Sequence, residues 1–143
     1  MLVSVLSRTL LFVVLIIGGL AAASGETAAP PNASVYIISP KDGDTVTNPF
    51  RVQFGLSGMG VAPAGVEKEH TGHHHLLIDV ATLPDAGQPI PNDEHHKHFG
   101  GGQTETVLRL APGTHTLQLE LGDANHVPFD PPVVSEKVTI HVK

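Results

Sequence analysis

The sequence contains no cysteine, and this absence removes several kinds of chemistry at once. Without thiols the chain forms no disulfide, holds no zinc through thiolates, binds no iron–sulfur cluster and attaches no c-type haem. Cysteine nucleophiles and a lipid-modified N-terminal cysteine are excluded for the same reason. Any metal site in this chain is therefore built without thiolate ligands.

Aromatic residues and positive charge are also scarce. The chain has no tryptophan, one tyrosine and 4% aromatic residues, and its formal net charge is −6. Nucleic-acid-binding modules need a basic footprint and usually aromatic rings on which bases stack. We therefore expect no nucleic-acid partner. The length of 143 residues predicts one domain.

Histidine, by contrast, is abundant and unevenly placed. Ten histidines occur in 143 residues, and seven of them lie within residues 69–99. Such a local excess requires a local explanation, and imidazole is both a metal ligand and a group that titrates near neutral pH. The candidate functional residues are therefore sought among these histidines.

Residues 1–23 have the pattern of a secretory signal peptide. Arg8 precedes an apolar run, residues 9–23, which ends in small residues with Ala21 and Ala23 placed for cleavage. A bilayer span needs about 20 residues, so this run favours cleavage, with an uncleaved membrane anchor as the alternative. Residues 24–32 are small, polar and proline-containing, which predicts a disordered leader. We expect an exported protein that has left the membrane after cleavage.

The remaining residues, 33–143, have the pattern of short strands joined by turns. Apolar and polar residues alternate in Phe50–Phe54 and again in residues 72–80, and no window after the signal shows a sustained helical period. These features predict an all-β domain, an immunoglobulin-like antiparallel β-sandwich, with a small Greek-key or cupredoxin-like barrel as the alternative. We expect strands in residues 34–39, 50–54, 72–80, 106–110, 115–121 and 137–142.

Three consecutive histidines lie near the start of one predicted strand. Side chains alternate between the two faces of a strand, so His74 shares a face with Leu76, whereas His73 and His75 share the other. We expect His74 in the core and the pair His73 and His75 exposed. Two imidazoles at this spacing can lean together to hold one metal ion; a polar strand edge is the alternative interpretation.

A second pair, His96 and His98, lies in the charged segment 92–98, beside His95. Two segments that each contribute two ring nitrogens would supply a four-nitrogen metal site, although this segment alone is also typical of a solvated loop. His126, in a polar segment of turn-forming residues, is a further contributor. The predicted metal ligands are therefore His73, His75, His96, His98 and His126.

The remaining histidines give weaker signals. His115 and His141 lie in alternating segments and are expected to be ordinary strand residues, and His70 is either an outer ligand or part of a charged loop. Imidazole ligands without thiolates suit Cu(II), Zn(II) or Ni(II). After the signal Met59 is the one soft ligand, which argues against a dedicated Cu(I) carrier. We expect Cu(II) or Zn(II) as the bound ion.

Several segments together resemble a bacterial secreted family, the domain of unknown function 4399. The resemblance lies in Val35–Gly43, Phe54–Gly65, Thr71–Asp79, His98–Glu105 and Leu121–Pro128, and spans residues 34–142. In the family pattern the histidine loop resembles Asn-His-x-His-Phe-Gly-Gly-Gly, so His96 and His98 match while His95 stands at the asparagine position. The resemblance implies an exported, periplasmic or secreted bacterial domain and carries no activity with it.

Three functions from different classes fit these observations. We favour a non-catalytic exported protein that buffers or delivers Cu(II) or Zn(II). The second is a metalloenzyme with three histidine ligands, in which Glu94, Glu105 or Asp79 acts as a base on a bound water. No recognised catalytic motif supports it. The third is an envelope interaction module, with a protein partner, whose histidines make its surface respond to pH.

The signal pattern generates a prediction about the mature protein. Expression of the whole chain in a host that exports it should yield a protein that begins at Ser24, because cleavage is expected after Ala23. Mass spectrometry of the purified protein measures this directly. A purified protein whose mass still includes residues 1–23 would instead support the membrane anchor.

Overall fold

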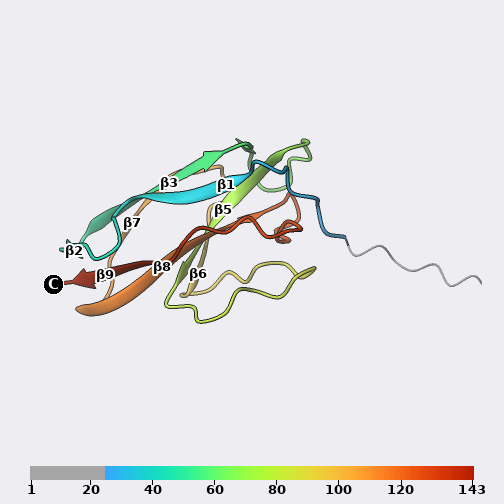
Figure 1. Cartoon of the computed structure of the whole chain (residues 1–143). Helices are drawn as coiled ribbons and strands as arrows, with labels where there is room; N and C mark the ends of the chain where they lie inside the picture. The colour runs from blue at the N-terminus through green and yellow to red at the C-terminus, as the bar shows by residue number, and fades with distance from the viewer. Residues whose placement is uncertain (1–24) are drawn as a thin grey trace, which may run out of the picture.

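Strands form where apolar residues alternate with polar ones, and the apolar faces of two sheets meet in a common core. The computed structural model describes residues 25–143, and within this range it contains nine strands and no helix (Figure 1). The smaller sheet has the order β1 (Ser34–Ser39), β3 (Phe50–Ser57) and β7 (Glu105–Leu108). The larger sheet has the order β2 (Thr45–Val46), β9 (Val138–Val142), β8 (Gly113–Gly122), β5 (Thr71–Ile78) and β4 (Gly60–Val61), with β6 (His96–His98) also paired to β5.

The hydrophobic core lies between the two sheets. The smaller sheet contributes alternate residues of β1 and β3, and the larger sheet contributes alternate residues of β5, β8 and β9, as the strand period of two requires. Phe99 and Phe129 extend the core from segments outside the strands. The most deeply buried side chains of this core are Val52, Leu76, Leu117, Leu119, Leu121 and Ile140.

The predicted all-β sandwich is confirmed, since the two sheets face each other and do not close into a barrel. Five of the strand pairings are antiparallel, as expected. Two short edge strands add parallel pairs to this sandwich, because β2 pairs parallel with β9 and β4 pairs parallel with β5. Both edge strands have only two residues, and each satisfies free backbone groups of its longer neighbour.

Residues 25–32, the part of the predicted leader that the structure describes, form hydrogen bonds with the rest of the domain. The Ala29 amide donates to the Asp130 carbonyl at 2.9 Å, and the Asp130 amide donates to the Thr27 carbonyl at 2.9 Å. The Thr27 hydroxyl also donates to the Asp123 carboxylate at 2.7 Å. These backbone pairs replace the solvent contacts that a free leader would make. The predicted signal peptide, residues 1–23, lies outside the described residues.

Strand β5 is buried on both faces, which positions the candidate site. Its inner face packs into the core, and its outer face lies under parts of two long connections, residues 79–95 and residues 123–137, which place Pro89, Ile90, Asn92 and His126 over it. The Ile90 amide donates to the His126 carbonyl at 2.9 Å and so joins the two connections to each other. Within the same described range, no helix has the length and apolar character needed to cross a bilayer.

The core packing generates a stability prediction. Leu119 has no exposed surface, so Leu119→Ala should lower the free energy of unfolding by about 2–5 kcal/mol through lost burial and a residual cavity. Val107, on the outer side of β7, is 60% exposed, and Val107→Ala is the control, with an expected change within about 0.5 kcal/mol. Urea unfolding of both variants measures the difference. Equal losses in the two would contradict the placement of the core.

Candidate metal centre

The alternation of β5 sends His73 and His75 to the outer face of the larger sheet and His74 to the inner face. His73 is 0% exposed and His75 is 1% exposed, so the expectation of an exposed pair is wrong. The reason is that the two connections cover this face, which the local sequence pattern does not reveal. His74 is buried in the core, as predicted, with its ring centroid 5.2 Å from that of Phe54.

Two further histidines reach the same face from different parts of the chain. His98 lies on β6, directly opposite His75 in the antiparallel register. His126 lies in the turn after β8 and has a positive φ of 68°, a left-handed conformation that needs local support in a residue with a Cβ atom. Asp123 supplies this support, because its carboxylate accepts hydrogen bonds from the amides of Asn125 and Val127.

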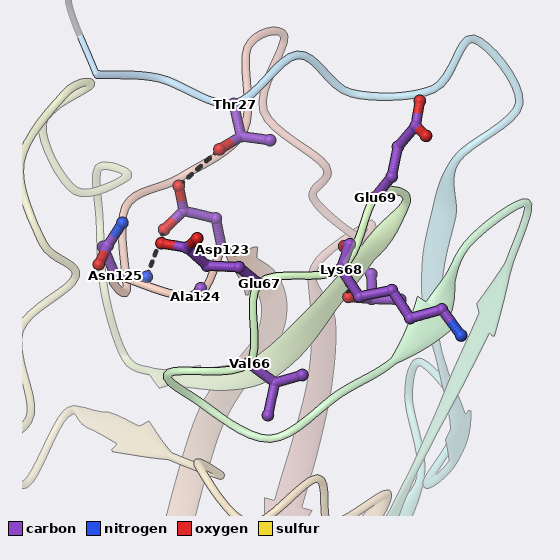
Figure 2. Close-up of a pocket in the computed structure, with 9 residues that line it drawn as sticks. Thr27, Val66, Glu67, Lys68, Glu69, Asp123, Ala124 and Asn125 are labelled. Carbon is purple, nitrogen blue, oxygen red and sulfur yellow. Dashed lines mark hydrogen bonds between the residues drawn. The ribbon is translucent and has the colours of Figure 1, made fainter.

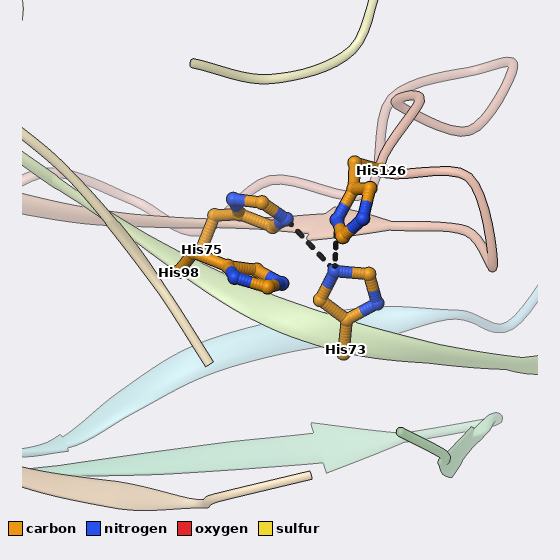
Figure 3. Close-up of side chains that lie close together, drawn as sticks. All are labelled: His73, His75, His98 and His126. Carbon is orange, nitrogen blue, oxygen red and sulfur yellow. Dashed lines mark hydrogen bonds between the residues drawn. The ribbon is translucent and has the colours of Figure 1, made fainter. Parts of the chain in front are cut away.

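The rings of His73, His75, His98 and His126 converge, as Figure 3 shows. Nε2 of His75 lies 3.0 Å from Nε2 of His73, which in turn lies 3.2 Å from Nδ1 of His126. One nitrogen from each of the four rings lies within 4.8 Å of the other three. Ligand nitrogens about 2.0–2.1 Å from a tetrahedral ion are separated by roughly 3.3 Å, so modest side-chain movement would bring all four onto one ion.

Two glycines leave the space that these rings occupy. A Cβ atom at Gly122 would lie 2.9 Å from Nε2 of His75 and 3.3 Å from Cα of His126. A Cβ atom at Gly100 would lie 2.6 Å from Nε2 of His98. Side chains at these positions would collide with the cluster, so the glycines fix how closely the rings approach the sheet.

The electrostatic environment favours the neutral form of three of the clustered histidines, His73, His75 and His98. Burial, together with the nearby His98 and His126, lowers the pKa of His73 to about 4. Burial, with the neighbouring histidines, also lowers the pKa of His75 to about 3. The pKa of His98 is lowered by burial and by His126. Neutral imidazoles keep the lone pairs that a metal ion needs, so at pH 7 protons compete little for the ring nitrogens of these three histidines.

Several polar atoms around the cluster are buried without a hydrogen-bond partner. They are Nδ1 of His73, Nδ1 of His75, Nε2 of His98 and both carboxylate oxygens of Glu120. Burial raises the pKa of Glu120 to about 7. Proteins rarely leave buried polar groups unpaired, and such groups concentrate where an ion or another ligand completes them.

A cavity gives access to the cluster. Its volume is about 230 Å³, and it is lined by His75, His98 and His126 together with Pro89, Ile90 and Asn92. Three of the four histidines therefore face a space that is large enough for a hydrated ion. The connection formed by residues 79–95 supplies the other wall.

A larger hollow, of about 330 Å³, lies at the turn that carries Asp123 (Figure 2). Its lining includes Thr27 from the leader and the charged residues Glu67, Lys68 and Glu69. The Asp123 carboxylate faces this hollow and is already bonded to the Thr27 hydroxyl and the Asn125 amide. None of the clustered histidines lines this hollow. The Asp123 carboxylate in its wall stabilises the turn that holds His126.

Comparison with known families gives one match. A family model described as domain of unknown function (DUF4399) matches residues 52–143, a range that includes all four clustered histidines. The chain belongs to the DUF4399 family. The resemblance seen in the sequence is thereby confirmed. No curated protein and no solved structure matches this DUF4399 chain.

The structure of this DUF4399 domain separates the predicted ligands. It brings His73, His75, His98 and His126 together, but His96 is not part of this group. Instead, the ring of His96 lies beside Asp93, with Nδ1 donating to the carboxylate at 2.9 Å. This carboxylate also accepts the His96 backbone amide, so it holds the side chain in the loop.

The other histidines of the DUF4399 domain lie apart from the cluster. His95 donates through Nδ1 to the Ile78 carbonyl, and His141 lies 3.1 Å from the Thr114 hydroxyl. His115 lies 2.7 Å from the Asp79 carboxylate, which raises its pKa. His70 is exposed. Sequence reasoning missed Glu120, because a charged residue that alternates with leucines is normally solvent-exposed.

The lowered pKa values generate a pH prediction for the metal-free DUF4399 domain. His73 and His74 have pKa values of about 4 and His75 of about 3, all lowered chiefly by burial from an ordinary 6.5. As the pH falls from about 7 to 4, these histidines become protonated in the unfolded chain but stay largely neutral in the folded chain. The free energy of unfolding should therefore fall, by on the order of 3 kcal/mol for each histidine.

Glu120 opposes this trend, because its raised pKa of about 7 makes the folded state bind a proton more tightly than the unfolded state. It should offset roughly a third of the loss. Urea unfolding with a chelator present, at several pH values, measures the slope. His74→Leu is the matched control, since it removes one buried histidine outside the cluster and should reduce the net slope by about half. A stability that does not change between pH 4 and 7 would contradict the assignment of neutral buried histidines.

Proposed function

We propose that the protein is an exported metal-binding protein that holds one Cu(II) or Zn(II) ion and buffers or delivers it. The ligands are His73, His75, His98 and His126. The observation that carries this proposal is the convergence of one nitrogen from each ring to within 4.8 Å of the others, on a covered face of the sheet. Four imidazole nitrogens at this spacing match the ligand number of a tetrahedral ion.

Hydrogen bonding alone accounts poorly for the cluster. Nε2 of His73 faces two neighbouring ring nitrogens, on His75 and on His126, at 3.0 Å and 3.2 Å. A neutral imidazole nitrogen is either a donor with one proton or an acceptor, so these contacts compete for few protons. A single cation would accept lone pairs from all four rings together. Metal binding thus gives these buried groups the partners that the protein itself does not supply.

The ligand set supports Cu(II) or Zn(II) as the ion. Every ligand is an imidazole, and imidazole suits zinc and copper. Met59, the one soft ligand after residue 23, is partly buried and packs against the hydrophobic core. The ion is therefore expected to be held by nitrogen atoms alone among the described side chains.

The arrangement favours reversible binding over catalysis. The cavity of about 230 Å³ exposes His75, His98 and His126 to an incoming ion or to an acceptor molecule. Two of the carboxylates considered as catalytic bases are engaged elsewhere: Glu105 pairs with Arg51 at 2.9 Å, and Asp79 pairs with His115. An accessible ion, with two of the three predicted bases engaged in ion pairs elsewhere, fits a protein that takes up and releases metal.

Export is the second part of the proposal. The apolar run of residues 9–23 and the alanines at its end support secretion to the periplasm or beyond. Absence of cysteine means that an oxidising compartment changes nothing in the ligand set. A protein that receives the ion in the envelope is the partner that this role requires.

Metal titration tests the proposal. The protein should be purified without a histidine tag, stripped with a chelator and titrated by calorimetry with Zn(II) and with Cu(II). We expect one ion per chain at submicromolar affinity. The mature protein purified directly from the host should contain that ion by elemental analysis. A melting temperature that rises with added ion gives a second readout, since a ligand of the folded state alone stabilises it.

A matched pair on β6 separates the cluster from a general histidine effect. His98→Ala should weaken binding at least about 100-fold, because even loss of an outer partner of a metal ligand costs about 10–100-fold. His96→Ala removes a histidine two residues away, bonded to Asp93, and should leave the affinity unchanged. Equal effects of the two variants, or weak binding of many ions by the wild type, would overturn the proposed site. Acid-dependent binding of an envelope protein without metal would support the interaction module.

A further inference from the structure

Glu120 is a buried carboxylate next to the cluster. It lies on β8 directly opposite His75 on β5, and His98 on β6 lies opposite His75 on the other side. Directly paired residues of antiparallel strands share a face, with Cβ atoms about 4.5–5.5 Å apart. Glu120, His75 and His98 therefore form one row across the outer face of the larger sheet. The side chain of Glu120 is among the most deeply buried, at 1% exposure.

No structural partner explains this carboxylate. Both of its oxygens are buried without a hydrogen bond. Asp123, also buried, provides the contrast, because its oxygens accept hydrogen bonds from Thr27, Asn125 and Val127. The hydrogen bonds of Asp123 stabilise a turn, whereas the carboxylate of Glu120 stabilises no part of the described fold by hydrogen bonding. A buried carboxylate without partners destabilises the fold, so its presence points to a bound species that it serves.

His75 shows what that species requires. Nε2 of His75 faces the cluster, and Nδ1 of the same ring is buried without a partner. A histidine that binds metal through one nitrogen carries a proton on the other, and that proton is usually donated to a carboxylate, a carbonyl or water. In addition, imidazole ligands carry no negative charge, so the ligands themselves compensate neither charge of a divalent ion.

We propose that Glu120 is the charge-compensating partner of the metal site and makes the site select divalent over monovalent cations. This inference rests on the proposed function. Glu120 acts through His75, as a positioning residue, and through its negative charge on the ion. Because the Coulomb energy is proportional to the charge of the ion, the carboxylate stabilises a divalent ion twice as strongly as a monovalent ion at the same place.

The test compares Zn(II) with Ag(I), a monovalent ion that does not change its oxidation state under these conditions, at pH 8. Glu120→Gln keeps the size of the side chain and removes its charge. We expect Glu120→Gln to weaken Zn(II) binding at least tenfold and Ag(I) binding by about the square root of that factor. Glu136→Gln, at an exposed position, makes the same change in net charge and should leave both affinities unchanged.

A spectroscopic readout separates charge from ligand geometry. Co(II) in place of Zn(II) reports coordination through its visible absorption, and the spectrum of Glu120→Gln should keep the band positions of the wild type. The metal-free variant should melt at the same temperature as the wild type or higher, because the change removes a buried unpaired charge. Glu120→Leu provides a second test of folding and should show the same loss of Zn(II) affinity.

The outcomes distinguish the two proposals. A wild type that binds no divalent ion overturns the proposed function and the role of Glu120 together. A wild type that binds Zn(II) normally, beside a Glu120→Gln variant of equal affinity, overturns the role of Glu120 alone. Equal fold-losses for Zn(II) and Ag(I), or a lower melting temperature of both metal-free variants, would show that Glu120 is merely structural.

Discussion

The burial of β5 on both faces is the constraint on which the rest of this structure depends. One face carries Leu76 and Ile78 into the core, and the other carries His73 and His75 beneath two connections that exclude water. Strands buried on both faces are usually apolar throughout, because polar groups removed from water need partners within the protein. Neutral imidazoles meet this demand only in part. The same burial that lowers their pKa values therefore leaves ring lone pairs without a cation and ring N–H groups without a hydrogen-bond acceptor.

Much of the fold follows from local patterns. Alternation of apolar and polar residues predicts most of the long strands, and the same alternation assigns His74 to the core and its two neighbours to the opposite face. These assignments succeed because the period of a strand is fixed by backbone geometry and needs no knowledge of the partners. Local patterns give no sign of the hydrogen bonds between the leader and Asp130, because these bonds join segments about a hundred residues apart.

The candidate site was predicted in part, for a related reason. Spacing alone pairs His96 with His98 as readily as His73 with His75, but Asp93 holds His96 in its own loop. A local carboxylate thus decided between two histidines that the pattern treats alike. For Glu120, alternation along the strand predicts the outer face correctly. Its burial is not predictable from nearby residues, because a connection distant in the sequence covers that face. Burial of a strand's outer face is a property of the whole chain and is invisible to the strand itself.

The bonds between the leader and the turn at Asp123 have a consequence for how this domain is attached to anything else. Thr27 holds the carboxylate that shapes the turn of His126, so the chain emerges from residue 25 at the end of the sandwich that carries this turn. The C-terminus leaves from the far end (Figure 1). A fusion partner or a lipid-embedded segment placed before residue 25 would therefore lie beside this turn. One placed after Lys143 would lie at the opposite end of the sandwich and leave the His126 turn accessible to other molecules.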